Sequence, residues 1–245
     1  MKHRADKLLV DRGLVSSRTR ARSLIEAGKV TIDGVIVTRP SDLLDVDSNL
    51  TISELDHPFV SRGGLKLDGA LTDLAVDVRD LVIADIGAST GGFTDCVLRR
   101  GAARVYAIDV GHDQLHPTLR IDPRVDSREG VNARHLTADS LPEPVNLVLV
   151  DASFISLEKL LPALVKLLSA DGRLLALVKP QFEVGPEHVG RRGVVSDDAL
   201  RKRALESVTA AAVACGFALV ASVDSRVVGP EGNREIFALF ALVPA

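Results

Sequence analysis

The segment from Leu81 to Asp95, LVIADIGASTGGFTD, limits the folds open to this chain more than any other. Its apolar start, Leu81 to Ala84, is typical of a short strand that is buried on both faces of a parallel sheet. The small residues from Gly87 to Gly92 allow a tight turn and the close approach of a ligand. A helix is expected from about Phe93 to Arg100, so the segment predicts the first strand–turn–helix unit of an α/β fold.

The residues around this turn favour a cationic ligand over a phosphate. The glycines are spaced as GxxxGG instead of the GxGxxG of dinucleotide sites, and the acid Asp85 stands two residues before Gly87. A second expected strand, Arg104 to Asp109, ends in an acid about 20 residues after the turn, where a carboxylate can accept ribose hydroxyls. S-adenosylmethionine carries a sulfonium and an ammonium group but no phosphate, so we expect it as the cofactor. The alternative is a glycine-rich turn that binds no ligand.

The expected cofactor contacts lie in the turn, at the end of the second strand, in an adenine-binding loop that starts at Asn132, and at the acid that ends a later strand. These residues are Asp85, Gly87, Ala88, Ser89, Thr90, Gly91, Gly92, Phe93, Asp109, Val110, Asn132, Ala133 and Asp151.

The charge of the chain is distributed unevenly. Its 245 residues carry a net charge of −3, yet residues 1–39 hold nine Lys and Arg against four acids, which indicates a dedicated polyanion-binding part. The two cysteines suggest neither a disulfide framework nor a metal site, and we expect no metal. The N-terminus lacks the apolar core of a signal peptide, and no uncharged stretch is long enough to span a bilayer, so we expect a soluble, cytoplasmic protein with no membrane contact.

The N-terminal part predicts a small α+β domain that binds RNA. We expect helices over 4–13 and from Ser16 or Ser17 to Ala27, followed by a hairpin over 29–37 that turns at Asp33-Gly34. The second helix leaves three arginines on its exposed side, where RNA phosphates would relieve their repulsion; an ordinary solvated face is the alternative. The phrase GLVSSRTRARSLIEAGKVTIDG resembles the small RNA-binding domain of ribosomal protein S-four. The expected RNA-binding residues are Arg4, Lys7, Arg18, Arg20, Arg22, Lys29 and Arg62.

A change of composition divides the chain. Acids gather between Asp42 and Asp56, and His57-Pro58 breaks regular structure. We therefore expect an RNA-binding domain over 1–55, a linker over 56–62 and an α/β domain over 63–245. In the α/β domain, helices are expected from about 61 to 74, over 157–168 with an interruption at Pro162, and over 197–215. Further strands are expected near Val125 and over 146–151, 173–179, 217–223 and 235–243.

Four charged residues are expected to meet at one edge of the sheet. Asp151 and Lys179 each end a buried strand, where a charge is costly unless it is used. Glu235 begins the last strand, which brings it to the same edge if that strand runs antiparallel. Lys66 lies just before the first strand and can reach the same crevice. The set contains two cations and two anions around one pocket.

The phrases VSRGGLKL, DIGASTGGFTD, DASFISL, LVKPQFEVG and GNREIF, in this order, resemble the FtsJ-like 2′-O-ribose methyltransferases and, along nearly the whole chain, the TlyA (hemolysin A) family of rRNA cytidine 2′-O-methyltransferases. The resemblance implies a class I, Rossmann-like methyltransferase sheet and an rRNA or ribosomal-subunit partner. It gives the catalytic roles to Lys66, Asp151, Lys179 and Glu235. Related enzymes often carry an acid in the adenine loop, where this chain has Asn132, whose amide oxygen can still accept a hydrogen bond.

The implied reaction is the transfer of a methyl group to a ribose 2′-hydroxyl, which must lose its proton during the attack. Lys179 is our choice for the activating residue, although which lysine acts as base and which steers the hydroxyl stays open. The short C-terminus favours the large subunit as target, with the small subunit as a further one. The sequence leaves the oligomeric state open.

Four rival functions are weighed against this interpretation. A base methyltransferase lacks its catalytic Cys or Pro-Pro-aromatic loop here, and a dehydrogenase would prefer GxGxxG. A non-enzymatic RNA-binding protein with an inactive α/β domain is the strongest rival. A membrane-active hemolysin lacks the apolar segment that it would need.

Overall fold

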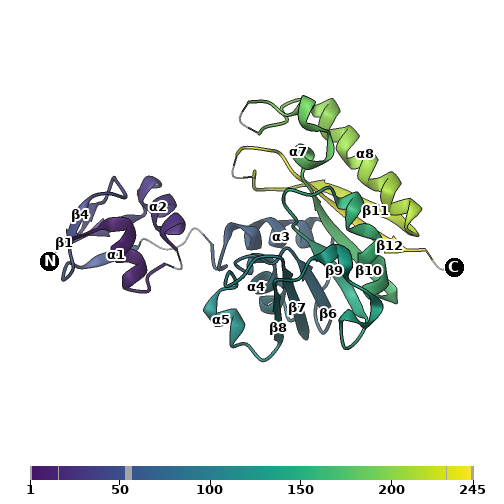
Figure 1. Cartoon of the computed structure of the whole chain (residues 1–245), viewed down its shortest axis with the longest axis horizontal. Helices are drawn as coiled ribbons and strands as arrows, with labels where there is room; N and C mark the ends of the chain where they lie inside the picture. Colours follow the sequence, from purple (N-terminus) through teal and green to yellow (C-terminus); the bar gives the residue numbers. More distant parts are fainter. Residues whose placement is uncertain (1, 16, 53–56, 192, 230, 244–245) are drawn as a thin grey trace. The chain divides into compact units, whose positions relative to one another are not determined.

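The computed structural model describes residues 2–15, 17–52, 57–191, 193–229 and 231–243. The chain divides into two compact units, Met1–Pro58 and Phe59–Ala245, which we describe separately (Figure 1). Phe59 is buried in the core of the second unit, and the first helix of that unit begins at Arg62, so residues expected in the linker take part in its packing.

The first unit packs two helices against short strands. Its elements are β1 (Lys2–Arg4), α1 (Ala5–Asp11), α2 (Arg18–Glu26), β2 (Val30–Ile32), β3 (Val35–Ile36), β4 (Leu43–Asp45) and β5 (Leu50–Ile52). The side chain of Ser17 accepts the N–H of Arg20 and so caps α2, as expected. Asp33 and Gly34 both have positive φ, which makes the hairpin turn between β2 and β3.

The sequence missed three strands of this unit. β1 pairs with β4, and β5 pairs with the far side of β2, each in antiparallel register. Each of them has three residues, which is too short for an alternating pattern to stand out. The core consists of Ala5, Leu8, Leu9, Ala21, Leu24, Ile25, Val30, Val37, Leu44 and Leu50.

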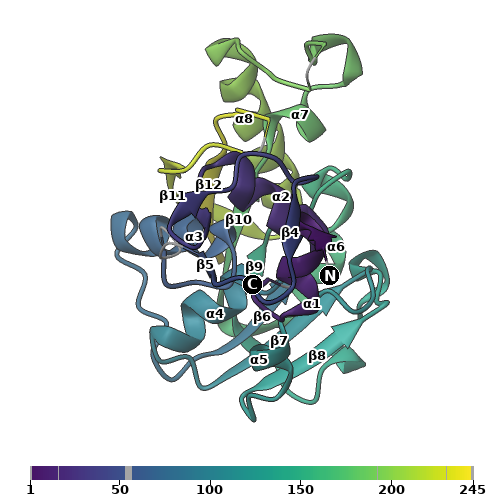
Figure 2. The same ribbon diagram turned by 90° about the vertical axis from the view of Figure 1, so that its left-hand side faces the viewer.

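The second unit is built on a seven-stranded sheet in the described part of the chain, in the order β11-β12-β10-β9-β6-β7-β8 (Figures 1 and 2). The strands are β6 (Val82–Ile86), β7 (Arg104–Asp109), β8 (Val125–Glu129), β9 (Val145–Val150), β10 (Leu168–Val178), β11 (Phe217–Asp224) and β12 (Ile236–Leu242). β12 runs antiparallel to both β10 and β11, while the pairs from β10 to β8 are parallel. The expected antiparallel last strand is confirmed.

Helices cover both faces of this sheet. They are α3 (Arg62–Asp73), α4 (Gly92–Arg99), α5 (Pro117–Arg120), α6 (Leu161–Leu164), α7 (Pro180–Glu183) and α8 (Asp198–Ala214). In β6, Ile83 packs in one core cluster with residues of α3 and α4, whereas Ala84 packs in the other with residues of α6 and α8. This two-sided burial explains the continuous apolar strands of the sequence. Among the described residues, no helix is both long and apolar enough to cross a bilayer.

The expected helix over 157–168 is wrong in its extent. The segment forms a 3₁₀ turn over Leu157–Lys159, the short α6, and a second 3₁₀ turn over Val165–Leu167. Pro162 has no N–H to donate, so it is tolerated only in the first turn of a helix, where it lies in α6. β10 then begins at Leu168, five residues before the expected strand, with an irregular register up to Arg173.

Candidate functional site

The turn after β6 has the backbone that its small residues predict. Gly87 and Gly91 have φ of 81° and 94°, and Ser89 between them has 48°, all in the left-handed region. A Cβ atom at Gly87 would lie 2.7 Å from the carbonyl oxygen of Asp151, so only glycine lets these two strand ends approach so closely. The turn leads directly into α4 at Gly92.

A cavity of about 570 Å³ opens at the carboxyl ends of the central strands, a size typical of small-molecule sites. Of the residues expected to bind the cofactor, its lining includes Gly87, Ser89, Asp109, Val110, Asn132, Ala133 and Asp151. The remaining six, Asp85, Ala88, Thr90, Gly91, Gly92 and Phe93, do not line it. Phe93 instead packs against Phe237, with 6.0 Å between ring centroids.

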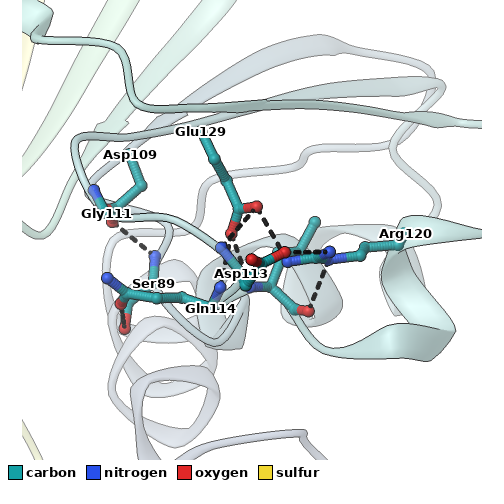
Figure 3. Close-up of polar contacts among 8 residues, drawn as sticks. Ser89, Asp109, Gly111, Asp113, Gln114, Arg120 and Glu129 are labelled. Carbon is teal, nitrogen blue, oxygen red and sulfur yellow. Dashed lines mark hydrogen bonds and ion pairs between the residues drawn. The ribbon is translucent and has the colours of Figure 1, made fainter.

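Asp109 is held at the cavity wall by two backbone groups. Its Oδ2 accepts the N–H of Ser89 at 2.8 Å, and its Oδ1 accepts the N–H of Gly111 at 2.7 Å (Figure 3). Each carboxylate oxygen keeps a further lone pair, so Asp109 can still accept hydrogen bonds from a ligand. The expected acid at the end of the second strand therefore has a fixed position.

A loop that the sequence did not single out lies beside Asp109. Glu129, at the end of β8, accepts the N–H groups of Asp113, Gln114 and Leu115 at 2.7–3.0 Å. Arg120 forms ion pairs with both Asp113 and Glu129, and together these contacts fix Gln114 in the cavity wall (Figure 3). The only signal in the sequence was the charge of Glu129 at a strand end.

Asp85 is buried completely beneath the turn. Burial first, and then the nearby carboxylates of Asp151 and Asp109, raise the pKa of its carboxyl to about 7, while the hydrogen bond from Thr94 opposes this increase. Thr94 donates to Oδ2 at 2.7 Å, whereas Oδ1 has no hydrogen-bond partner in the described part of the chain. A buried carboxyl with one free oxygen next to a ligand turn suits a site for a cation.

The four charged residues expected at the sheet edge form two buried ion pairs. Lys66 Nζ lies 2.5 Å from Glu235 Oε2, and Lys179 Nζ lies 2.7 Å from Asp151 Oδ1. Lys179 also donates to the hydroxyl of Ser153 at 2.8 Å. Three of the four residues are less than 9% exposed, and the Asp151 side chain is 23% exposed. Such charges are tolerated only when they are paired.

The sheet register explains why these residues meet. Val178 of β10 pairs with Ile236 of β12, so the next position along the ladder sets Lys179 opposite Glu235. In the parallel ladder of β6 and β9, Ile86 pairs with Val150, which brings Asp151 beside Gly87. Lys66 reaches Glu235 from α3.

Two further residues fix the segment before Glu235, and sequence reasoning missed both. The carboxamide of Asn233, 1% exposed, accepts the N–H of Val195 at 2.9 Å and donates to the carbonyl of Gly193 at 2.7 Å. Arg201 of α8 donates to the carbonyl of Arg234 at 3.1 Å. The signal for Asn233 was the phrase GNREIF, in which the asparagine is an unusual residue to bury.

The expected RNA-binding residues lie in both units. In the first, Arg4 and Arg18 both bind the buried carboxylate of Asp6, and these contacts, the hydrogen bond from Arg4 first, hold the pKa of Asp6 well below its usual range. Lys7 and Arg22 are exposed, while Arg20 and Lys29 are partly buried. Arg62 belongs to α3 of the second unit and donates to the carbonyl of Val228 at 3.2 Å.

The donor set of the cavity fits S-adenosylmethionine. The carboxylates of Asp109 and Asp151 and the amide of Asn132 line one volume, and they suit hydroxyl, ammonium and amino groups. No cluster of three or more metal-ligating side chains occurs within the described ranges.

Comparison with known proteins agrees with this geometry. A model of the FtsJ-like methyltransferase family matches residues 59–241, and a model of the S4 domain, the module of ribosomal protein S-four, matches residues 4–50. The chain is 47% identical to the 16S/23S rRNA (cytidine-2′-O)-methyltransferase TlyA of Mycobacterium tuberculosis, over 96% of this chain and 88% of that protein. It is 38% identical to Hemolysin A of Brachyspira hyodysenteriae, over 98% of this chain and 100% of the other.

A solved structure supports the same assignment. A hemolysin-type protein from Streptococcus thermophilus superposes with a TM-score of 0.80 at 41% identity, over 99% of this chain and 89% of the other. The chain belongs to the TlyA family, in which an FtsJ-like methyltransferase domain follows an S4 domain.

Proposed function

We propose that this protein transfers the methyl group of S-adenosylmethionine to the 2′-hydroxyl of a cytidine ribose in the rRNA of the large ribosomal subunit. The observation that carries the proposal is the pairing of Lys179 with Asp151, which lines the cavity, and of Lys66 with Glu235 at the same edge of the sheet. The M. tuberculosis relative named above is described as acting on both 16S and 23S rRNA, and a 32% identical relative from Campylobacter jejuni as acting on 23S rRNA.

The cofactor would be held by the residues around the cavity. Asp109 would accept the ribose hydroxyls, Asn132 would accept from the adenine amino group, and the carboxylate of Asp151 would favour the cationic end, with Asp85 acting on the same end from beneath the turn. S-adenosylmethionine supplies an electrophilic methyl group on its sulfonium. The other expected turn residues, which do not line the cavity, would act through the backbone shape of the turn.

The two ion pairs would have different tasks. Both partners of Lys179, Asp151 and Ser153, line the cavity, so Lys179 would lie beside the 2′-hydroxyl. In the transfer, the bond from the 2′-oxygen to the methyl carbon would form while the methyl–sulfur bond breaks, and the proton of the 2′-hydroxyl would pass to Lys179 in its neutral form, whose resulting ammonium Asp151 would stabilise. Lys66, held by Glu235, would orient the hydroxyl.

The RNA would be bound mainly through its phosphates. Arg4, Lys7, Arg18, Arg20, Arg22 and Lys29 would contact the backbone from a domain over 1–55, and Arg62 from the start of α3 in the second unit. Chemistry would belong to the domain over 63–245. An rRNA substrate places the protein with the ribosomes in the cytoplasm.

The test is transfer of labelled methyl from S-adenosylmethionine to purified ribosomal subunits, followed by mapping of ribose methylation in both rRNAs. We expect one 2′-O-methylated cytidine in the large subunit, and Lys179→Ala should bind cofactor but transfer nothing. RNA binding without any transfer by the wild-type protein would establish the non-enzymatic alternative. Methylation of a base would refute the proposed chemistry.

A further inference from the structure

The short helix α7 and the loop that follows β9 lie against each other next to the site. At one end, Lys179 just before α7 donates to Ser153 of the loop. Further along, the rings of Phe182 and Phe154 lie 5.4 Å apart between centroids. The loop, residues 151–156, therefore contacts the segment of α7 at successive positions along its length.

Glu183 closes the far end of this contact. Its Oε2 accepts the hydroxyl of Ser156 at 2.8 Å, and its Oε1 accepts the N–H of Leu157 at 3.0 Å. Ser156 in turn accepts the N–H of Glu158 at 3.3 Å and so caps the 3₁₀ turn that ends the loop. Both oxygens of Glu183 are thus committed to the loop.

The loop needs such an anchor because its backbone is strained. Phe154 has a φ of 63°, in the left-handed region that a side chain with a Cβ atom disfavours. The residue as a whole is 92% exposed, so burial of its own side chain does little to offset that cost. Contacts on both sides of Phe154 must hold the conformation: Lys179 on Ser153 before it, and Glu183 on Ser156 and Leu157 after it.

Glu183 has no other evident task at the site. It does not line the cavity, whereas Asp151, Ala152, Ser153, Phe154 and Ile155 of the loop all do. Partial burial raises the pKa of its carboxyl, against the hydrogen bonds from the loop that lower it. Because burial of this carboxyl is costly and both of its oxygens bind the loop, holding the loop is the role that its contacts support.

We propose that Glu183 is a positioning residue of the methyl-transfer reaction: it holds the loop 151–156 so that Ser153 keeps Lys179 in place and the loop backbone keeps its shape at the cavity. The inference rests on the proposed function. It also assigns α7 a purpose, since this helix and the residue that caps it carry both anchors of the loop within five residues, Lys179 to Glu183.

The decisive comparison is between two substitutions of the same residue. Glu183→Gln keeps both contacts, because its amide oxygen still accepts from Leu157 and its amide nitrogen can donate to the Ser156 oxygen. Glu183→Ala loses both. We expect Gln to transfer methyl at near the wild-type single-turnover rate and Ala to be slower by about 10- to 100-fold at saturating cofactor. Glu158→Ala, which removes an exposed neighbouring acid, is the matched control and should have no effect.

A second pair of variants guards against a folding defect in Glu183→Ala. Ser156→Ala removes one of the two loop groups that Glu183 binds, together with the cap on Glu158, and should slow transfer severalfold; in Glu183→Ala only the smaller effect of the lost cap should remain. If Glu183→Ala fails to fold, the methyl-transfer rate of Ser156→Ala tests the anchoring role on its own. A Gln variant as slow as Ala would show that the charge or proton of Glu183 matters, and a full rate in Ala or Ser156→Ala would exclude the anchoring role. If the wild-type protein transfers no methyl group, the proposed function itself is refuted.

Discussion

The Lys66–Glu235 pair lets stability and catalysis be separated. Lys66→Met leaves Glu235, 1% exposed, without its cation at 2.5 Å. Removing one partner of a buried pair costs about 3–5 kcal/mol of unfolding free energy. For a unit of this size, that corresponds to a fall in melting temperature of roughly 6–20 °C. Glu235→Leu should cost a similar unfolding free energy, because it leaves the ammonium of Lys66 buried without its carboxylate.

The double variant Lys66→Met/Glu235→Leu should behave differently. It buries two apolar side chains and no charge, so its free energy of unfolding should return to within about 1–2 kcal/mol of the wild type or exceed it. Its methyl transfer should nevertheless be lost, because neither group remains at the site.

The assay is thermal unfolding followed by circular dichroism, with methyl transfer to ribosomal subunits measured on the same samples. Arg79→Met, which breaks an exposed ion pair with Asp77 at 2.6 Å, is the control and should change stability by no more than about 1 kcal/mol. A double variant that is stable and fully active would refute a catalytic role for the pair. One as unstable as the single variants would refute the reasoning about its burial.

Three further perturbations test other parts of the structure. The pKa of Asp85 is raised from 3.8 to about 7, so the folded protein binds a proton that the unfolded chain releases, and stability should fall as pH rises from about 4 to 7; chemical denaturation of Asp85→Asn should lack this fall. Asp109→Ala frees the N–H groups of Ser89 and Gly111 and removes the expected ribose acceptor, so calorimetry should show cofactor affinity about 10- to 100-fold weaker with RNA binding unchanged. Arg22→Ala, at an exposed position, should weaken rRNA binding and reduce the slope of log K against log salt by about 1; an unchanged slope would mean that Arg22 contacts no phosphate.

The central sheet could be predicted from the sequence because its strands are buried on both faces. Runs such as 147–150 are apolar throughout and are followed directly by an acid, which marks both the strand and its functional end. The turn at Gly87 could be predicted for a related reason, since its backbone needs the conformations that glycine allows. These features depend on consecutive residues, so a sequence pattern is enough to predict them.

The missed features depend on contacts between distant segments. In the sequence, Glu183 is an ordinary acid, and only the folded chain shows that it binds the end of the loop 151–156. Glu129 is likewise an acid at a strand end, and only the folded chain shows that it accepts three N–H groups. The three-residue strands β1, β4 and β5 exist because they pair with one another or with β2, not because their residues favour a strand strongly. No window of the sequence contains both partners of such a contact.

The pairing of the four charged residues shows how far the site could be predicted from the sequence. Strand ends and the antiparallel last strand predict that Asp151, Lys179 and Glu235 share one sheet edge, and the register explains this. Sequence alone does not say which lysine pairs with which acid, because both pairings satisfy the same charges. The structure gives Lys179 the two partners that line the cavity and leaves Lys66 with Glu235, which does not line it. That asymmetry is the physical reason for our proposal that Lys179 takes the proton and Lys66 orients the hydroxyl, a distinction that the residue types could not make.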